Sequence, residues 1–275
     1  SMDMLGTGNN PYTVIGVGSG TGGAMYSEGA SATNQGMYAR NTSPTASHDF
    51  SGSAFNTGSM PNTPRITRFQ YTNSGNIRST IVNGGSILAN SGAVAFNKVS
   101  SARRIGSNLA GGAYYNGAFG ELIVYNRVLT AAEVQKVESY LALKYGLTLS
   151  NNNNANATPL EAPNSSGIHE GDYVASDGTV YWDASANSAY HNDVAGLGRE
   201  DCTGLHQAQS GSVNANAVVR MTLDSMLAGS NQSVIDSVNN DKSFLMWGSN
   251  GQNTNINAPV SFPTNGFNST IRMNR

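Results

Sequence analysis

The chain has 275 residues, of which 12% are charged, and its formal net charge is −2. The 15 basic residues are scattered singly, so no basic stripe argues for a nucleic-acid or anionic-membrane partner. The length suffices for one large domain or two modest ones, each with a buried core. Turn-forming Gly, Asn and Ser residues separate short apolar runs, a composition that favours an all-β sandwich over a helical protein.

Cysteine usage and hydropathy exclude further classes of protein. Cys202 is the single cysteine, so neither an internal disulfide nor a thiolate metal site is expected. No apolar run approaches the length of a membrane span, which argues against membrane insertion. Ser1-Met2 is typical of the residues left by tag cleavage, and we expect any secretion signal to lie outside this sequence.

Strand patterns dominate the first part of the chain, between clusters of Gly, Asn, Ser and Pro. Asn83-Gly84 follows one such pattern and is the signal for a type I′ hairpin turn. Residues 41–62 predict a long loop or weakly paired strands, and such a loop either serves in binding or only covers a sheet edge. The glycine-rich residues 16–20 predict a turn, because neither a helix pattern nor a lysine follows as a phosphate loop requires. The predicted strands are 12–18, 35–40, 65–72 and 77–83.

Residues 117–149 predict a strand followed by a helix. The strand is expected at 119–126, where β-branched and aromatic residues alternate between two faces. Thr130 and Glu133 have the spacing of a capping box, and Gly146 supplies a left-handed residue that ends a helix. We therefore expect a helix over 130–145, with Lys144 favourably placed at its negative end. Its apolar stripe is predicted to be Val134, Val137, Leu141 and Tyr145, and its water-facing residues Gln135, Lys136, Glu138 and Ser139.

The strand GELIVYNR and the following LTAAEVQKVESYLALKYG closely resemble a segment of a known family. They are similar to the closing strand and C-terminal helix of bacterial concanavalin A-like, laminin G-like jelly-roll domains. The resemblance implies that residues 1–150 form a jelly-roll sandwich with one C-terminal α-helix. In this family the segment ends a lectin or glucanase sandwich, and further strands precede one like 12–18, so we expect either a trimmed N-terminus or a short variant of the domain. One fold hosts many functions, so the resemblance bears on fold more than on activity.

A second domain is predicted after residue 150. Residues 151–156, followed by Pro159 and Pro163, have no apolar periodicity and predict a solvated linker. The later segments SDGTVYWD, HNDVAGLGRED and KSFLMWG resemble a β-sandwich module that follows this type of helix in large bacterial surface proteins. That resemblance implies a second β-sandwich over 151–275, with a C-terminus that the family extends by further strands. Its predicted strand regions are 172–183, 191–201, 204–213, 216–223 and 241–250.

The acidic residues of the first domain show no catalytic pattern. A glycosidase needs two carboxylates facing each other across a sugar, and the resembled glucanases usually present them as Glu-x-Asp-x-x-Glu. No such run occurs, and no Gly-x-Ser-x-Gly elbow is present. His191 and His206 have no further partners in the sequence, so structural roles are expected rather than zinc binding. We therefore expect no enzyme. The acidic residues considered are Asp3, Glu28, Asp49, Glu121, Glu133 and Glu138.

Oxygen ligands for a hard cation are concentrated in the second domain. Calcium takes six to eight oxygens from carboxylates, amides and carbonyls, which these residues could provide together. The alternative is that the aspartates form turns, above all Asp177-Gly178, which is a standard hairpin tip. The acidic residues and amides of this stretch are Asp172, Asp177, Asp183, Asn192, Asp193, Glu200 and Asp201, and our candidate calcium ligands are Asp177, Asp183, Asn192 and Asp193.

Aromatic residues are the remaining candidates for ligand recognition. Exposed rings stack on sugar faces, and amide side chains bond sugar hydroxyls. Tyr114, Tyr115 and Asn116 lie in a Gly-rich loop and are our candidate ligand-binding residues, with packing as the alternative. Trp182 and Trp247 lie in apolar strand patterns and are expected in the core.

Taken together, these patterns predict a non-catalytic carbohydrate- or surface-binding module of a secreted or cell-surface bacterial adhesin-like protein. Its partners would be a glycan or a cell-surface or matrix polymer, and the neighbouring domains of a longer chain. Calcium is the one expected cofactor. The alternatives are a structural spacer that binds no ligand, and a glycoside hydrolase.

Overall fold

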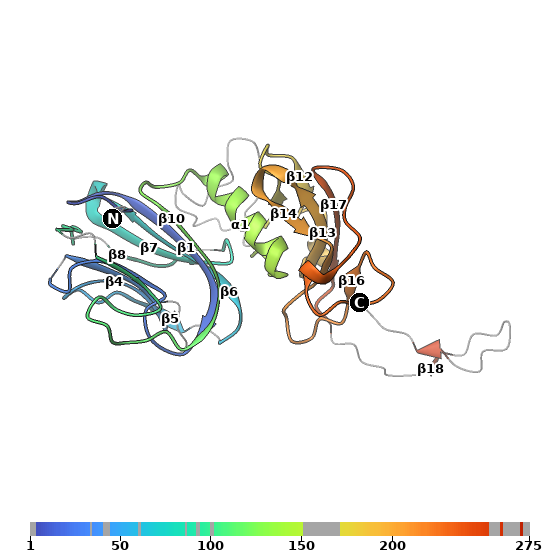
Figure 1. Ribbon diagram of the computed structural model, residues 1–275, viewed down its shortest axis with the longest axis horizontal. Helices are drawn as coiled ribbons and strands as arrows, with labels where there is room; N and C mark the ends of the chain where they lie inside the picture. The colour runs from blue at the N-terminus through green and yellow to red at the C-terminus, as the bar shows by residue number, and fades with distance from the viewer. Residues whose placement is uncertain are drawn as a thin grey trace.

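The computed structural model describes residues 4–33, 35–40, 45–59, 62–85, 87–91, 94–99, 102–150, 171–252, 259–260 and 270–271. Within these ranges the chain is an all-β sandwich with one α-helix, which confirms the predicted fold class. Figure 1 shows helix α1, Ala131–Tyr145, between the sandwich and the strands of the second region. No helix in the described ranges is long and apolar enough to cross a membrane.

Two five-stranded antiparallel sheets form the sandwich. All four predicted strands before residue 84 occur, and the strand predicted at 119–126 is β10. The first sheet has the order β10-β1-β6-β7-β8, with β10 Gly117–Tyr125, β1 Tyr12–Gly20, β6 Arg65–Thr72, β7 Ile77–Val82 and β8 Ile87–Ser91. The second has the order β5-β4-β3-β2-β9, with β5 Asn56–Ser59, β4 Thr45–Phe50, β3 Gly36–Arg40, β2 Tyr26–Gly29 and β9 Arg103–Ile105.

The predicted turn at residues 16–20 is wrong, because these residues continue strand β1. The glycines are needed there because neighbouring side chains cross the strand closely. A Cβ on Gly16 would overlap the sulfur of Met25, and a Cβ on Gly20 would lie 2.9 Å from the ring of Tyr115. Glycine therefore marks close packing over a strand here, rather than a reversal of the chain.

The loop alternative for residues 41–62 is also wrong where the structure describes them. Strands β4 and β5 lie in this stretch and pair within the second sheet. The Asn83-Gly84 turn is confirmed, because both residues have positive φ angles of 50° and 68° and the N–H of Gly85 donates to Val82 O at 2.9 Å. It leads from β7 into β8.

Aromatic rings fill the space between the two sheets. Phe50 stacks on Phe96 with ring centroids 4.8 Å apart and meets Tyr71 edge-on at 5.2 Å. A fully buried ion pair, Lys98 Nζ to Glu28 Oε1 at 2.7 Å, lies in the same region. The buried apolar cluster here is Leu5, Tyr12, Val14, Tyr26, Met37, Ala39, Phe50, Phe69, Tyr71 and Phe96.

Helix α1 begins and ends as predicted. The Thr130 side chain accepts from the N–H of Glu133, and the Glu133 carboxylate accepts from the N–H of Thr130 at 2.9 Å, so the capping box is complete. Gly146 ends the helix in the left-handed conformation, with φ of 64°. Lys144 lies in the last turn, where its charge suits the helix dipole.

The predicted water-facing side of α1 is wrong for Gln135, Glu138 and Ser139, which are all buried. Gln135 Nε2 and Ser139 Oγ both donate to the carbonyl of Asp172 in the second region, at 2.5 and 3.4 Å. Glu138 pairs with Arg68 of β6 at 2.9 Å, and both side chains are almost fully buried. The helix is therefore covered on its polar side as well as on its apolar side.

The second region consists of short antiparallel strands. The predicted hairpin tip at Asp177-Gly178 is confirmed, with Gly178 at φ of 93° and its N–H donating to Ala175 O at 2.9 Å. Strands β14-β13-β17 form a three-stranded sheet, and β11-β12, β15-β16 and β18-β19 are two-stranded. The predicted linker at 151–156 lies outside the described residues. The strands are β11 Tyr173–Val174, β12 Val180–Trp182, β13 Asn192–Glu200, β14 Leu205–Gln207, β15 Gln209–Gly211, β16 Arg220–Thr222, β17 Ser243–Ser249, β18 Pro259–Val260 and β19 Thr270–Ile271. The 3₁₀ turns of this region are Ser188–Tyr190, Asp201–Thr203 and Asn231–Ser233, and a further one, Ser74–Asn76, lies between β6 and β7 of the first sheet.

One buried cluster joins the outer face of the first sheet, the helix and the second region. Trp182 belongs to it as predicted, whereas Trp247 is only half-buried. The imidazole of His191 accepts from Trp182 Nε1 at 2.8 Å and contacts Leu149 O at 2.8 Å, a structural role in agreement with the sequence. The buried members are Ile15, Val17, Ile66, Leu129, Val134, Leu141, Ala142, Leu147, Leu149, Tyr173, Trp182 and Val194.

Candidate ligand-binding groove

A groove of about 270 Å³ lies where β10, α1 and the second region meet. Side chains two residues apart on β10 share one face of the sheet, and side chains three or four apart on α1 share one face of the helix. Both faces are turned toward the groove. It is lined by Glu121, Ile123 and Tyr125 from β10, by Lys136, Val137 and Tyr140 from α1, and by Ser176, Glu200 and Thr203 from the second region.

Glu121 is held in place by three side chains of α1. Its Oε2 accepts from Lys144 Nζ at 2.7 Å and from the hydroxyl of Tyr145 at 3.3 Å, and its Oε1 accepts from the hydroxyl of Tyr140 at 3.4 Å. Burial alone would lower the pKa of Lys144, but its hydrogen bonds to Glu121 and Tyr140 outweigh burial and raise it above its ordinary value. The carboxylate is therefore oriented before any ligand arrives.

Glu200 forms the opposite side of the groove and is also oriented. Its Oε1 accepts from the N–H of Ser176 at 2.6 Å, and its Oε2 accepts from the hydroxyl of Thr203 at 3.0 Å. The side chain is buried apart from the surface that it presents to the groove. Thr203 ends the 3₁₀ turn that follows β13, and Gly204 after it adopts a left-handed conformation with φ of 68°.

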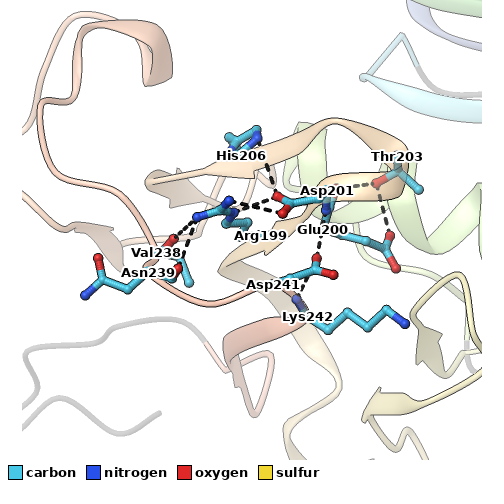
Figure 2. Close-up of polar contacts among 9 residues, drawn as sticks. All are labelled: Arg199, Glu200, Asp201, Thr203, His206, Val238, Asn239, Asp241 and Lys242. Atoms are coloured by element: carbon cyan, nitrogen blue, oxygen red, sulfur yellow. Dashed lines mark hydrogen bonds and ion pairs between the residues drawn. The ribbon is translucent and has the colours of Figure 1, made fainter.

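A network of charged side chains positions this turn (Figure 2). Arg199 binds Asp201 with two hydrogen bonds, of 2.6 and 3.1 Å, and also donates to the carbonyl of Asn239 at 3.1 Å. The hydrogen bonds from Arg199 lower the pKa of Asp201. His206 lies 4.0 Å from the same carboxylate and is largely exposed.

The network continues to the β11–β12 hairpin. Asp241 Oδ1 accepts from the backbone N–H groups of Asp201 and Lys242, at 2.8 and 2.9 Å (Figure 2). Lys242 Nζ then pairs with Asp177 at 2.6 Å, and this hydrogen bond is the main cause of the lowered pKa of Asp177. Hydrogen bonds and an ion pair thus connect the groove wall formed by Glu200 and Thr203 to the β11–β12 hairpin.

The predicted calcium ligands have contacts of their own in the second region, where Asn192 and Asp193 are neighbours at the start of β13. Asp183 accepts from the N–H of Ala186 at 2.8 Å in a local turn. Asp193 accepts from Asn214 Nδ2 at 2.9 Å and from Ser249 Oγ at 2.6 Å. Asn192 is exposed at the start of β13, and Asp177 pairs with Lys242 as described above. In the part of the chain that the structure describes, no three His, Cys, Asp or Glu residues are grouped as a metal ion would require.

The predicted ligand-binding loop at 114–116 lies at the start of β10. Tyr114 is 71% exposed and free to meet a ligand. Tyr115 is half-buried and donates from its hydroxyl to Ser19 O at 2.9 Å, and Asn116 Nδ2 donates to Thr21 Oγ1 at 3.1 Å. Two of the three side chains thus have contacts within the fold, and Tyr114 and Asn116 are both exposed to solvent.

The groove itself was missed by sequence reasoning, although some of its lining residues were considered singly. Glu121 was considered only as one half of a catalytic pattern, and Glu200 only as an oxygen ligand. The alternation of Glu121, Ile123 and Tyr125 on one strand face was a usable signal. A second signal was the four-residue spacing of Lys136 and Tyr140 on the helix that directly follows.

The fold is a β-sandwich of two antiparallel sheets to which a helix and a smaller β-region are attached. The sequence profile of a family described as "Domain of unknown function (DUF8202)" matches residues 133–275, and the chain belongs to this family. The match begins within α1 and covers the second region. No curated protein matches the chain.

Solved structures resemble about half of the chain. The carbohydrate-binding module CBM40 of the Ruminococcus gnavus IT-sialidase has a TM-score of 0.38 at 10% identity, over 45% of this chain and 79% of that one. A heptameric SAP-like pentraxin from Limulus polyphemus has a TM-score of 0.38 at 17% identity, over 50% and 74%. A putative carbohydrate-binding protein from Bacteroides ovatus has a TM-score of 0.37 at 15% identity, over 47% and 41%.

Proposed function

We propose that the protein is a non-catalytic carbohydrate-binding module, and that a glycan binds in the groove between β10, α1 and the second region. One observation carries the proposal: the groove combines two tyrosine rings with carboxylate and hydroxyl groups that the fold already orients. A secreted or cell-surface protein of the adhesin type is the setting in which such a module would act.

The groove has the mixed chemistry that a sugar ring requires. Tyr125 and Tyr140, with Ile123 and Val137 beside them, offer surfaces on which the apolar face of a sugar can pack. Acceptors such as Glu121 can take hydrogen bonds from sugar hydroxyls. Because its carboxylate is already held by Lys144, little conformational entropy is lost when a sugar binds.

Glu121 and Glu200 line the same groove, and this specific observation favours a glycoside hydrolase as the second candidate. A hydrolase needs one carboxyl group that donates a proton to the leaving oxygen. Both oxygens of Glu121 and both oxygens of Glu200 accept hydrogen bonds from the protein. Neither group is held as a proton donor, which supports binding over hydrolysis.

The proposal is tested on a broad glycan array, with millimolar calcium and again with a chelator. We expect Tyr125→Ala to weaken binding of any array ligand about fivefold, since a stacked ring contributes on the order of 1 kcal/mol. Tyr114→Ala is the matched control, because it removes an exposed ring outside the groove and should leave binding unchanged.

Other results would redirect the proposal. Loss of binding in Tyr114→Ala alone would move the site to the loop at 114–116. Loss of binding in chelator alone would assign calcium a role, with Asp177, Asp183, Asn192 and Asp193 as the residues to mutate. An array without any bound glycan would support the structural spacer, and release of reducing sugar from a bound glycan would establish the hydrolase.

A further inference from the structure

A second hollow, of about 580 Å³, opens beside the groove. We call it the side pocket. Its lining includes Lys144 and Tyr145 from the end of α1, Leu205 and His206 from β14, and Asn231 and Ile235 from the loop before β17.

The side pocket and the groove are in contact on their helix side. Lys144 lines the side pocket, and its Nζ lies 2.7 Å from Glu121 Oε2 and 2.6 Å from the hydroxyl of Tyr140, two residues that line the groove. The hydroxyl of Tyr145, also in the side pocket, donates to the same oxygen of Glu121 at 3.3 Å. The boundary between the two hollows is therefore a single layer of side chains.

They are also in contact on the opposite side. Thr203 lines the groove, and the next residue, Gly204, lines the side pocket. This turn is held by the network around Asp201, so both hollows share one rigid wall. The far rim of the side pocket is rigid as well, because the Asn231 side chain accepts from the N–H groups of Ala208 and Gln209 at 2.8 and 2.9 Å.

We propose that the groove and the side pocket are consecutive subsites of one site that binds a linear, uncharged oligosaccharide, with the Glu121–Lys144 pair at the junction. This inference rests on the proposed function. Ligand sites for small molecules span about 300–1,000 Å³, so the groove alone is at the lower limit and suits a single small unit. The two hollows together have room for several sugar units in a row.

The charges that line the two hollows argue against an acidic oligosaccharide as the ligand. Among the described lining residues, the positive charges are those of Lys136 and Lys144, and the negative ones are those of Glu121, Glu200 and Asp236. The balance leaves no surplus of positive charge, which a polymer of uronic or sialic acids would need. Hydroxyl-rich, neutral sugars match this lining better.

The test is titration calorimetry of the full chain with neutral oligosaccharides of increasing length. Mono-, di-, tetra- and hexasaccharides built from glucose, mannose or N-acetylglucosamine are the probes, together with sialylated and uronic-acid chains of matched length. We expect affinity to rise about tenfold from the disaccharide to the tetrasaccharide, because the added units enter the side pocket.

Two variants on exposed side chains separate the subsites without endangering the fold. His206→Ala and Ile235→Ala should weaken hexasaccharide binding and leave disaccharide binding unchanged, whereas Tyr125→Ala should weaken both. Met226→Ala is the matched control, since Met226 is exposed as Ile235 is and lines neither hollow.

The outcomes distinguish the two proposals. Affinity that stops rising at the disaccharide, with no effect of His206→Ala or Ile235→Ala, would overturn the extended site and leave glycan binding in the groove intact. Tighter binding of sialylated or uronic-acid chains would overturn the preference for uncharged chains. No binding at any length would overturn the extended site and the proposed function together.

Discussion

The two faces of the sheet β10-β1-β6-β7-β8 are buried in different ways. Its inner face meets the second sheet through aromatic rings, and the described members of that core all precede α1 in the chain. Its outer face meets α1, and the buried cluster there continues through Leu147 and Tyr173 into the second region. The sandwich thus closes a core of its own, whereas the second region shares its core with the helix and the sheet.

The second region compensates for short strands with side-chain hydrogen bonds to the backbone. The side-chain amide of Gln209 accepts from the N–H of Ala228 at 2.6 Å and donates to the carbonyl of Ala228 at 2.9 Å, as a neighbouring strand would. Asp224 accepts from the N–H groups of Ile235 and Asp236. Such bonds define the course of a loop but bury little apolar surface, so most of the stability of this region must come from its contact with α1.

The largest expected effect comes from separating the two regions. A fragment of residues 151–275 lacks α1, the first sheet and most of the shared core, so we expect it to show no cooperative unfolding transition. Thermal unfolding followed by near-ultraviolet circular dichroism is the measurement. A matched fragment that begins at Leu129 keeps α1 and should recover part of the signal, and a sharp transition in the shorter fragment would contradict a shared core.

Glu138→Ala should weaken the joint between sheet and helix. It leaves the guanidinium of Arg68 buried without its carboxylate partner, which costs about 3–5 kcal/mol in the free energy of unfolding. Urea denaturation measures the loss. Arg127→Ala breaks the exposed Arg127–Glu133 pair and serves as the control, with little change expected. Equal effects of the two variants would show that burial of the pair is not what matters.

Acid should weaken both cores through their buried imidazoles. Burial, with the nearby charge of Arg78, lowers the pKa of His48 to about 3, and burial also lowers the pKa of His191. The unfolded chain therefore binds more protons than the folded one below about pH 6.5. The free energy of unfolding has its full value above that pH and declines as the pH falls toward 3. For His48 the loss at pH 4.5 is about 2–3 kcal/mol.

Single histidine variants assign this pH dependence to one core or the other. Urea midpoints at pH 7 and pH 4.5 should lie closer together in His48→Gln, which reports on the sandwich, than in the parent chain. His191→Gln reports in the same way on the core around Trp182. An unchanged difference between the two pH values in both variants would mean that other groups cause the acid sensitivity.

Local signals in the sequence were reliable where the structure they predict is local. Thr130 with Glu133, Asn83-Gly84 and Asp177-Gly178 all act within four residues, and each was correctly predicted. Glu138 was placed in water because helical periodicity reveals one apolar stripe and says nothing of a partner 70 residues away.

The groove could be predicted only in part for the same reason. The sequence shows the groove-lining faces of β10 and α1 as two separate patterns. The third wall of the groove comes from Glu200 and Thr203, far along the chain. The distance between such walls depends on how the elements pack, which neither alternation nor helical spacing encodes. Tyr114 was identified as an aromatic ring in a glycine-rich loop, which is a local property, and the ring is exposed in the structure.

Strand β1 has a consequence for the order in which the chain can fold. One of its two neighbours in the sheet is β10, which is synthesised well after it, and the hydroxyl of Thr13 donates to the carbonyl of Arg127, 114 residues later. At about 5–20 residues per second on the ribosome, β1 waits for roughly 5–20 seconds before that partner exists. Because α1 follows β10 directly, the sheet gains its last strand and its helical cover almost together. Until then the nascent chain has an incomplete sheet with an exposed apolar face. The sandwich is therefore completed in one late step.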